Sequence, residues 1–244
     1  MRGIFYFMNY EIDQQKLSEQ IILTAKKTAV VSGLYILLVF IIVFALYSIG
    51  LFLLFDSPKE FFRLSDPKYI EELLVLKASK ILLLNMGVSI LMHYFLSGIY
   101  GIIKNGLDLP YSDIGNAFKS IFSKQGLKVL NVIVLVQILS TGISYLLDLA
   151  GFGLVGFGMS LLVQFLTYFA IPSIYISNSG VRKSIQKSIS LVNQKPGFLI
   201  FFISVTYFLS LIGILFLGIG IILTLPLNYI VAYSLYIHIS EQID

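Results

Sequence analysis

The chain has 244 residues, of which 57% are hydrophobic and only 12% are charged, and it contains neither Cys nor Trp. This composition lies outside the range of soluble domains, and the lack of Cys excludes disulfides, a thiolate nucleophile and a Cys-rich metal site. The net charge of +4 is spread over short segments between apolar runs, which indicates membrane topology and not a nucleic-acid-binding patch.

Five stretches without Asp, Glu, Lys or Arg follow one another along the chain, at 28–55, 81–103, 129–147, 149–181 and 196–240. About 20 apolar residues cross a bilayer core as a helix, so four stretches predict one span each and the last is long enough for two. Gly218 and Gly220 divide the last stretch, and Gly151 and Gly153 predict the turn before span four. The sequence therefore predicts an all-α integral membrane fold, with one polytopic domain over 1–244 and six spans at about 29–54, 80–103, 127–148, 157–178, 197–217 and 220–239.

The distribution of basic residues predicts the orientation of these spans. With both termini on the cytoplasmic side, twelve Lys and Arg residues fall inside and five fall outside, as the positive-inside rule favours. We therefore expect a multi-pass protein of the cell membrane with both termini in the cytoplasm. Because Trp is absent, the aromatic belt at the membrane surfaces is expected to come from the fifteen Tyr residues.

The outside segment between spans one and two carries two signals for the start of a helix. Ser57-Pro58 is followed by Glu60, and Asp66-Pro67 repeats the combination of a capping side chain with proline at the first helical position. The sequence therefore predicts short helices in this loop.

An amphipathic segment precedes each pair of spans, so the chain consists of three units, each a surface helix followed by a transmembrane hairpin. Apolar residues recur at 114, 118, 121 and 122 in the second unit and at 181, 185, 189 and 192 in the third, while the first unit, 12–27, is a looser match. Gly126 and Gly197 follow where the chain must turn from surface to span. Such helices lie in the membrane interface with their basic side towards the lipid headgroups. The residues expected to contact anionic headgroups are Lys119, Lys124, Arg182, Lys183 and Lys187.

Two segments resemble a known family. Residues 109–118, which read Leu-Pro-Tyr-Ser-Asp-Ile-Gly-Asn-Ala-Phe, and the following Gly126-Leu127-Lys128 resemble the second-unit signature of the polytopic membrane family catalogued as domain of unknown function 4013. The run 218–227 is similar to the last hairpin of that family. The resemblance covers about residues 105–240 and implies a six-span prokaryotic membrane protein without established catalytic residues. Where the surface helix of the family carries tryptophan and acidic residues, this chain has Tyr111 and Ser112.

Polar side chains at membrane depth are the strongest functional candidates in such a chain. In span two they recur every fourth residue and form one gently winding stripe. The candidate intramembrane polar cluster consists of Asn85, Ser89, His93, Ser97, Asn131, Gln137, Thr141, Gln164 and Asn228. Three interpretations stay open: these residues join helices through hydrogen bonds, they line a polar cavity, or some of them face lipid with their hydroxyls bonded back to the helix.

Pro172 and Pro226 predict breaks in spans four and six. Such breaks are either ordinary kinks or the discontinuous helices that line transport sites. His93 is the only ionisable side chain near the centre of a span. It is either a neutral histidine held by hydrogen bonds or a proton-linked switch. Neither His93 nor His238 has a carboxylate nearby in a metal-ligand pattern, and the phosphate-loop, HExxH and nucleophile-elbow motifs are absent. We therefore expect no catalytic residue, no metal and no cofactor.

Three functions remain compatible with these patterns. The favoured one is a non-catalytic scaffold, anchor or accessory subunit whose inside amphipathic helices contact lipid, a cytosolic partner or a second copy of the chain. The second is a small transporter or permease subunit with a polar path between spans two, three and six. The third is a lipid-modifying membrane enzyme, for which the spans offer only His93 and hydroxyl groups.

Overall fold

A computed structural model describes residues 12–55, 60, 63–108, 112–215 and 224–242. These residues are almost entirely helical and form no strand. The elements are α1 (Gln14–Phe52), η1 (Arg63–Ser65), α3 (Pro67–Leu76), α4 (Ala78–Ser97), α5 (Ile99–Asp108), α6 (Ile114–Ile121), α7 (Lys124–Leu149), α8 (Gly153–Leu166), α9 (Ala170–Ser177), α10 (Val181–Gln194), α11 (Pro196–Leu215) and α13 (Leu227–Ser240).

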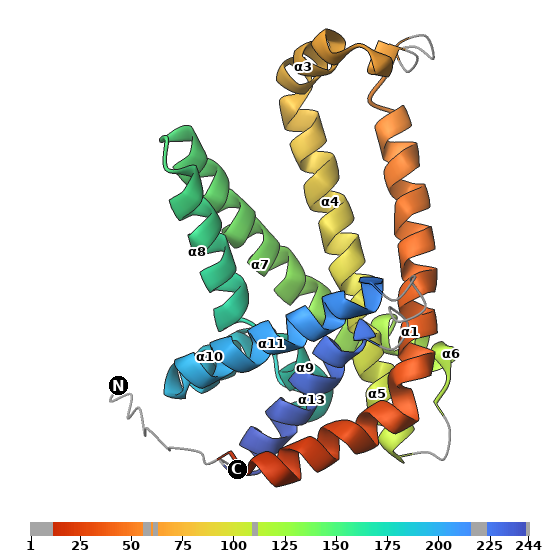
Figure 1. The fold of residues 1–244 in the computed structure, drawn as a ribbon, viewed down its shortest axis with the longest axis vertical. Coiled ribbons are helices and arrows are strands. Elements are labelled where there is room, and N and C mark those ends of the chain that lie inside the picture. The colour runs from red at the N-terminus through yellow and green to blue at the C-terminus, as the bar shows by residue number, and fades with distance from the viewer. Residues whose placement is uncertain (1–11, 56–59, 61–62, 109–111, 216–223, 243–244) are drawn as a thin grey trace.

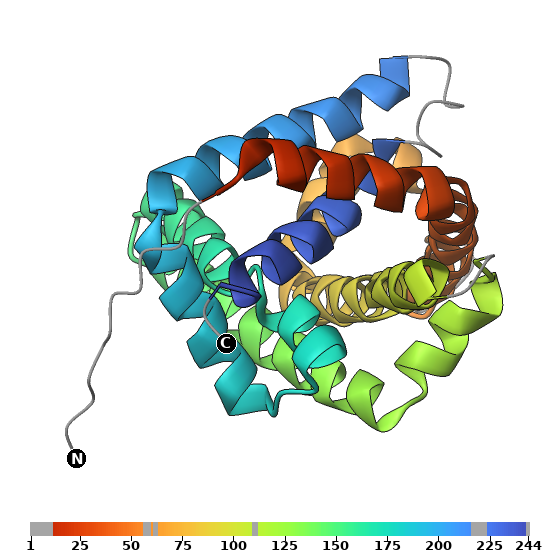
Figure 2. The ribbon, with the colours of Figure 1, turned by 90° about the horizontal axis from the view of Figure 1, so that it is seen from below.

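Two helical hairpins rise from a compact base (Figure 1). The first pairs α1 with α4 and carries α3 at its far end, and the second pairs α7 with α8. The base contains the N-terminal part of α1 together with α5, α6, α9, α10 and α13. Seen from below, α13 lies in the middle of the base, beside the N-terminal part of α1 (Figure 2). The two hairpins diverge away from the base and leave a gap between them.

Within the described ranges, four helical segments are long and apolar enough to cross a membrane: Gln14–Phe52, Ala78–Asp108, Lys124–Leu149 and Gly153–Ser177. Val181–Gln194 and Pro196–Ser210, which meet at a bend of 101°, make a fifth candidate if they count as one span. The structure thus agrees with an all-helical protein of four or five such segments. The sixth expected span corresponds to α13, of which 14 residues are described, and the expected turn at Gly218 and Gly220 lies outside the described residues.

The first expected surface helix and the first expected span form one continuous helix, α1, of 39 residues. A straight helix of that length would extend ~58 Å, about twice the thickness of a bilayer core. The helix bends, and its N-terminal part lies across the base while the rest forms the first hairpin (Figure 1). Thr24 and Thr28 donate their hydroxyls to the carbonyls of Gln20 and Thr24, at 2.7 and 2.8 Å. Such back-bonding is a known cause of helix bending.

The other two expected surface helices are α6 and α10, and each packs on the protein core through one face. In α6 the buried residues are Ala117 and Ile121, and in α10 they are Ser184, Ser188, Leu191 and Val192. In α10 this face is rotated from the expected apolar stripe and includes two serines: Ser188 bonds the backbone at the end of α8, and Ser184 bonds the carbonyl of Val181 in its own helix. The segments therefore form helices where the repeat predicted them, and their buried faces contact protein.

Helix α13 lies at the centre of the base and is buried almost all round. Ten of its 14 residues are buried, at Ile230 to Tyr236 and at His238, Ile239 and Ser240. A helix that is hydrophobic on all sides is buried on all sides, either in protein or in lipid. Helix α13 is buried by the other helices of the protein. At its end, Nε2 of His238 accepts a hydrogen bond from the backbone N–H of Asp13 at 3.2 Å, which joins the C-terminal helix to the start of α1.

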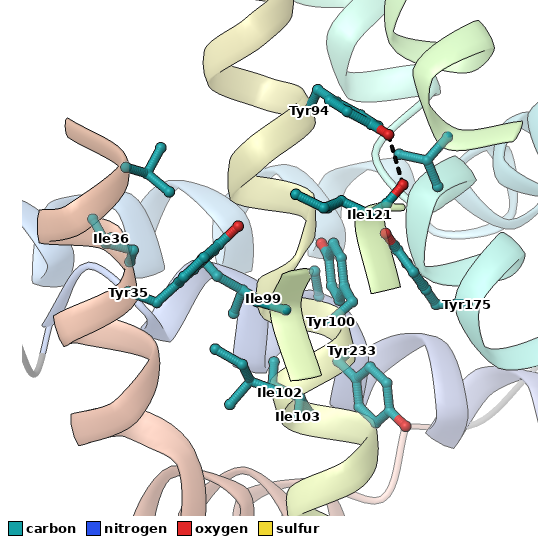
Figure 3. Packing of buried hydrophobic residues seen from close by; sticks show 14 of the residues in the cluster. Tyr35, Ile36, Tyr94, Ile99, Tyr100, Ile102, Ile103, Ile121, Tyr175 and Tyr233 are labelled. Carbon is teal, nitrogen blue, oxygen red and sulfur yellow. Dashed lines mark hydrogen bonds between the residues drawn. The ribbon is translucent and has the colours of Figure 1, made fainter. Parts of the chain in front are cut away.

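Tyrosines form much of the core and not only a surface belt. The buried ones are Tyr35, Tyr69, Tyr94, Tyr100, Tyr175, Tyr233 and Tyr236. The ring of Tyr100 lies 5.9 and 6.4 Å from the rings of Tyr175 and Tyr233 (Figure 3), and 5.8 Å from the ring of Tyr229. Protein covers these seven residues, so an aromatic belt at the membrane surfaces would have to come from the other tyrosines of the chain. A buried phenol needs a hydrogen-bond partner, and Tyr94 finds one in the carbonyl of Ile121, at 2.6 Å.

Span two is broken into α4 and α5 at Gly98. The carbonyl of Phe95, at the end of α4, accepts from the N–H of Gly98 at 2.9 Å and also from the hydroxyl of Tyr35 at 2.7 Å. A Cβ on Gly98 would lie 2.7 Å from that hydroxyl and 3.1 Å from Cβ of Ala117. Glycine is thus required here because α1 and α6 approach the backbone closely.

Span four is broken between Leu166 and Ala170, and α10 supplies the missing hydrogen bonds. The hydroxyl of Ser188 donates to the carbonyl of Leu166 at 2.7 Å and accepts from the N–H of Phe169 at 3.0 Å. Pro172 lies in the first turn of α9, after the break. In an unbroken helix its ring would clash with the carbonyl four residues earlier. Pro226 directly precedes α13, at a helix start, where its missing N–H costs nothing.

We expect Ser188→Ala to lower the stability of the protein, because it leaves both backbone groups of the α8–α9 break without a partner. Leaving a buried polar group unsatisfied costs about 1–3 kcal/mol. The measurement is the thermal unfolding midpoint of the purified protein in detergent. Ser190→Ala is the matched control, since Ser190 lies on the same helix and is exposed. Equal midpoints for the two variants would contradict this role of Ser188.

The far end of the first hairpin confirms one of the two predicted helix starts. Asp66 caps α3 by accepting from the N–H of Lys68 at 3.0 Å, and Pro67 occupies the first helical position. Residues 57 and 58 lie outside the described residues. Lys77 pairs with Glu60 at 3.6 Å, and the guanidinium of Arg63 lies 4.3 Å from the ring centre of Tyr69.

Candidate functional site

A pocket of about 320 Å³ lies between the two hairpins, at the level of the two helix breaks. Eight helices and the residues just before α13 and between α8 and α9 contribute to its wall. The apolar lining is Ile36, Phe40, Leu96, Val132, Ile133, Val136, Ile171 and Leu225, and the remaining lining residues are His93, Tyr100, Gln137, Gln164, Thr167, Tyr168, Tyr207, Asn228 and Tyr229. An apolar pocket with a few convergent polar groups is the usual form of a small-molecule site.

The structure brings six of the nine predicted polar residues to this pocket or next to it. His93, Gln137, Gln164 and Asn228 line the pocket, and they come from α4, α7, α8 and α13. Ser89 and Thr141 do not line it but bind the side chain of Gln137. The hydroxyl of Ser89 donates to Oε1 of Gln137 at 3.2 Å, and Nε2 of Gln137 donates to Oγ1 of Thr141 at 3.0 Å.

The other three predicted residues lie elsewhere. Ser97 is buried at the α4–α5 break, where its hydroxyl donates to the carbonyl of Tyr94 at 2.6 Å and lies 3.4 Å from the hydroxyl of Tyr175. Asn85 and Asn131 are exposed and line none of the pocket. The nine residues therefore differ in what they do. Ser89 and Gln137 join two helices by a hydrogen bond, Ser97 bonds back to its own helix in the core, and four residues line the pocket.

The hydrogen bond of His93 determines which ring nitrogen carries a proton. Its Nδ1 lies 2.8 Å from the carbonyl oxygen of Ser89. A carbonyl can only accept, so Nδ1 carries a proton, and in the ring that has this one proton Nε2 is an acceptor. Within the described residues Nε2 has no hydrogen-bond partner, so His93 brings an unused acceptor to the pocket wall.

Asn228 is the second polar residue of the wall with an unsatisfied group. Its Oδ1 is buried without a hydrogen-bond donor among the described residues, whereas its backbone carbonyl accepts from the hydroxyl of Tyr168 at 3.4 Å. Buried polar atoms are nearly always paired, so an unpaired one points to a missing partner such as a water or a ligand.

Sequence reasoning did not select the tyrosines of the wall, Tyr100, Tyr168, Tyr207 and Tyr229. Their positions contained a signal, since each lies within a charge-free stretch and all but Tyr100 lie more than ten residues from its ends. A tyrosine at membrane depth needs a partner for its hydroxyl, which a tyrosine in the belt obtains from water.

The predicted headgroup contacts divide into two groups. Lys119, Lys124, Arg182 and Lys183 are exposed on α6, α7 and α10. Lys187 instead places its ammonium 5.3 Å from the ring centre of Tyr236, on the inner side of α10.

Two other lysines bind the C-terminal end of α9. Nζ of Lys104 donates to the carbonyl of Tyr175 at 3.0 Å, and Nζ of Lys128 donates to Oδ1 of Asn178 at 3.1 Å. Asn178 has the left-handed conformation, with φ of 49°, that commonly ends a helix. Cations are favourable at this negative end of the helix dipole, so these lysines stabilise the base.

Within the described part of the chain, no three His, Asp or Glu side chains lie close enough to hold a metal ion. Comparison of the chain with family models, with curated proteins and with solved structures found no match. The pocket therefore has to be interpreted from its own chemistry.

Proposed function

We propose that this protein is a small transporter or permease subunit that binds a small uncharged solute in the pocket between its two hairpins. It would span a prokaryotic cell membrane six times with both termini in the cytoplasm, as the resemblance to domain of unknown function 4013 and the distribution of basic residues suggest. One observation carries the proposal: polar side chains from four helices line one pocket, and the described residues of its wall include no Asp, Glu, Lys or Arg.

The helix breaks support a binding role for this pocket. Leu96 and Tyr100, on either side of Gly98, line it, and so do Thr167 and Tyr168 at the α8–α9 break. Irregular backbone at membrane depth is tolerated where it is buried in protein or lines a cavity, and many transporters bind their substrates at such breaks. Both broken helices reach the pocket at the same level.

Cysteine labelling tests whether the pocket is open to water, and the native chain contains no Cys to interfere. We expect a water-soluble thiol reagent to modify Thr167→Cys in membranes, because Thr167 lines the pocket. The reagent reacts efficiently only with a hydrated thiolate. The unreactive controls are therefore Phe44→Cys, on the exposed outer face of α1, and Ser97→Cys, in the core. If Thr167→Cys and Ser89→Cys are as unreactive as these controls, there is no aqueous path here.

The scaffold function stays a second candidate because four basic side chains, Lys119, Lys124, Arg182 and Lys183, are exposed on helices of the base. Such residues attract anionic lipid headgroups by about 1 kcal/mol each. An unreactive pocket in the cysteine experiment would favour this function, in which the polar residues only join helices.

A further inference from the structure

The pocket between the hairpins does not end at α8. A groove of about 620 Å³ between α8 and α11 shares Gln164, Tyr168 and Tyr207 with it, so these three side chains form the border of both spaces. The groove is otherwise lined by Gly158, Leu161, Leu162, Phe165, Ile200, Ile203 and Ser204. A polar pocket and an apolar groove thus lie next to each other across one common wall.

The pocket has polar groups on its wall and the groove is mostly apolar, as the head of an amphiphile is polar and its tail apolar. Apart from the shared residues, the groove offers aliphatic and aromatic side chains and the single hydroxyl of Ser204. Its rim is accessible from outside, since Leu161, Leu162 and Ile200 are about half exposed. In a bilayer these exposed side chains face lipid tails, so a hydrocarbon chain can enter from the side.

We propose that pocket and groove together hold one uncharged amphiphile, with a hydroxyl-bearing head in the pocket and a single hydrocarbon tail in the groove. The inference rests on the proposed function, because it assigns a substrate class to the same pocket. It identifies the ligand as a lipid-like molecule, such as a monoacylglycerol, in place of a small water-soluble solute.

The head group follows from the donors and acceptors of the wall. The free Nε2 of His93 accepts a hydrogen bond, and the amides of Gln164 and Asn228 contribute further polar atoms. A hydroxyl both donates and accepts, so it can satisfy such a mixed set. A phosphate or carboxylate would find no Lys or Arg among the described residues of the wall, and burying a charge without a partner is costly.

A tryptophan reporter tests the inference in the full chain, which has no native Trp. We would introduce Phe165→Trp in the groove and Phe44→Trp on the exposed face of α1, in phosphatidylcholine nanodiscs. The probes carry one dibromostearoyl chain, whose bromines quench tryptophan on contact, and differ only in the head: glycerol monoester, free carboxylate or lysophosphatidate. We expect saturable quenching of Phe165→Trp by the glycerol ester at mole fractions where Phe44→Trp is quenched weakly and equally by all three probes.

Substitutions at His93 show whether the pocket recognises the head. We expect His93→Phe to weaken the apparent affinity for the glycerol ester about tenfold, the value of one good hydrogen bond. His93→Gln keeps an acceptor near the position of Nε2 and should bind close to the native value. Asn85→Leu, on the same helix but exposed outside the pocket, should have no effect.

Two outcomes would overturn the inference. Quenching of Phe165→Trp that rises linearly with mole fraction and is equal for the three heads would mean that the groove only borders bulk lipid. Stronger binding of the carboxylate or lysophosphatidate would mean that the head class is wrong. Either result leaves the proposed function to be judged separately, by the labelling of Thr167→Cys.

Discussion

Gly126→Ala is expected to be among the most destabilising single substitutions in this protein. A methyl group at this position would overlap the backbone carbonyl oxygen of Ile121, which lies directly before the turn from α6 into α7. That oxygen is also the acceptor for the buried hydroxyl of Tyr94 (Figure 3), so the backbone cannot move without breaking this bond. We expect a loss of about 3 kcal/mol or more of unfolding free energy, at the upper end of overpacking effects, measured by chemical denaturation in mixed micelles.

Gly142→Ala is the matched control for this prediction, because Gly142 lies in the interior of the same helix with no neighbouring atom where a Cβ would be placed. Alanine there should stabilise the protein by about 0.5–1 kcal/mol, through its higher helix propensity. If both variants change stability by similar amounts, the contact at Ile121 does not limit position 126.

Removing the side chain of Tyr35 is expected to have an effect of similar size. This ring is fully buried, packs edge-on against Phe118 with 5.6 Å between ring centres, and donates to the carbonyl of Phe95 at 2.7 Å. We expect Tyr35→Ala to cost about 3–5 kcal/mol, as for other large aromatic residues in cores. Tyr35→Phe should cost about 0.5–1.5 kcal/mol, because it removes one hydrogen bond while the carbonyl of Phe95 keeps the bond from the N–H of Gly98.

The free energy of unfolding of both Tyr35 variants is measured in the same micelles. The difference between them separates the contribution of ring packing from that of the hydroxyl's hydrogen bond. Tyr145→Phe and Tyr145→Ala are the controls, since this tyrosine lies on α7 with 48% of its surface exposed. A Tyr35→Phe variant as stable as the native protein would show that the hydroxyl does not hold the break.

Charge-free stretches located the helices well, because charged side chains are excluded from hydrocarbon and from protein interiors alike. Span three, expected at about 127–148, is α7 at Lys124–Leu149, and the predicted turn after it contains Gly151 with φ of +83°. The break at Gly98 could not be predicted in this way. Its cause is the close approach of Tyr35 and Ala117, which lie far from Gly98 in the chain.

The stripe of polar residues in span two shows the same limit. Regular spacing placed Asn85, His93 and Ser97 on one winding face, but the helix ends at Ser97, which lies in the core, while Asn85 is exposed. Only His93 of the three lines the pocket. Ser97 lies between the lining residues Leu96 and Tyr100, but it is buried and its hydroxyl donates to the carbonyl of Tyr94. The packing of neighbouring helices around each residue decided this, and spacing within one helix carries no such information.

The sequence by itself determined that the chain is helical and suited to a membrane, since long apolar runs without charge have few other stable structures. It could not determine whether an apolar helix is covered by lipid or by protein, because both surroundings are apolar, and α13 at the centre of the base is the clearest example. Tertiary structure alone decided which polar side chains meet, because His93, Gln137, Gln164 and Asn228 come from four helices whose ends are set by distant partners.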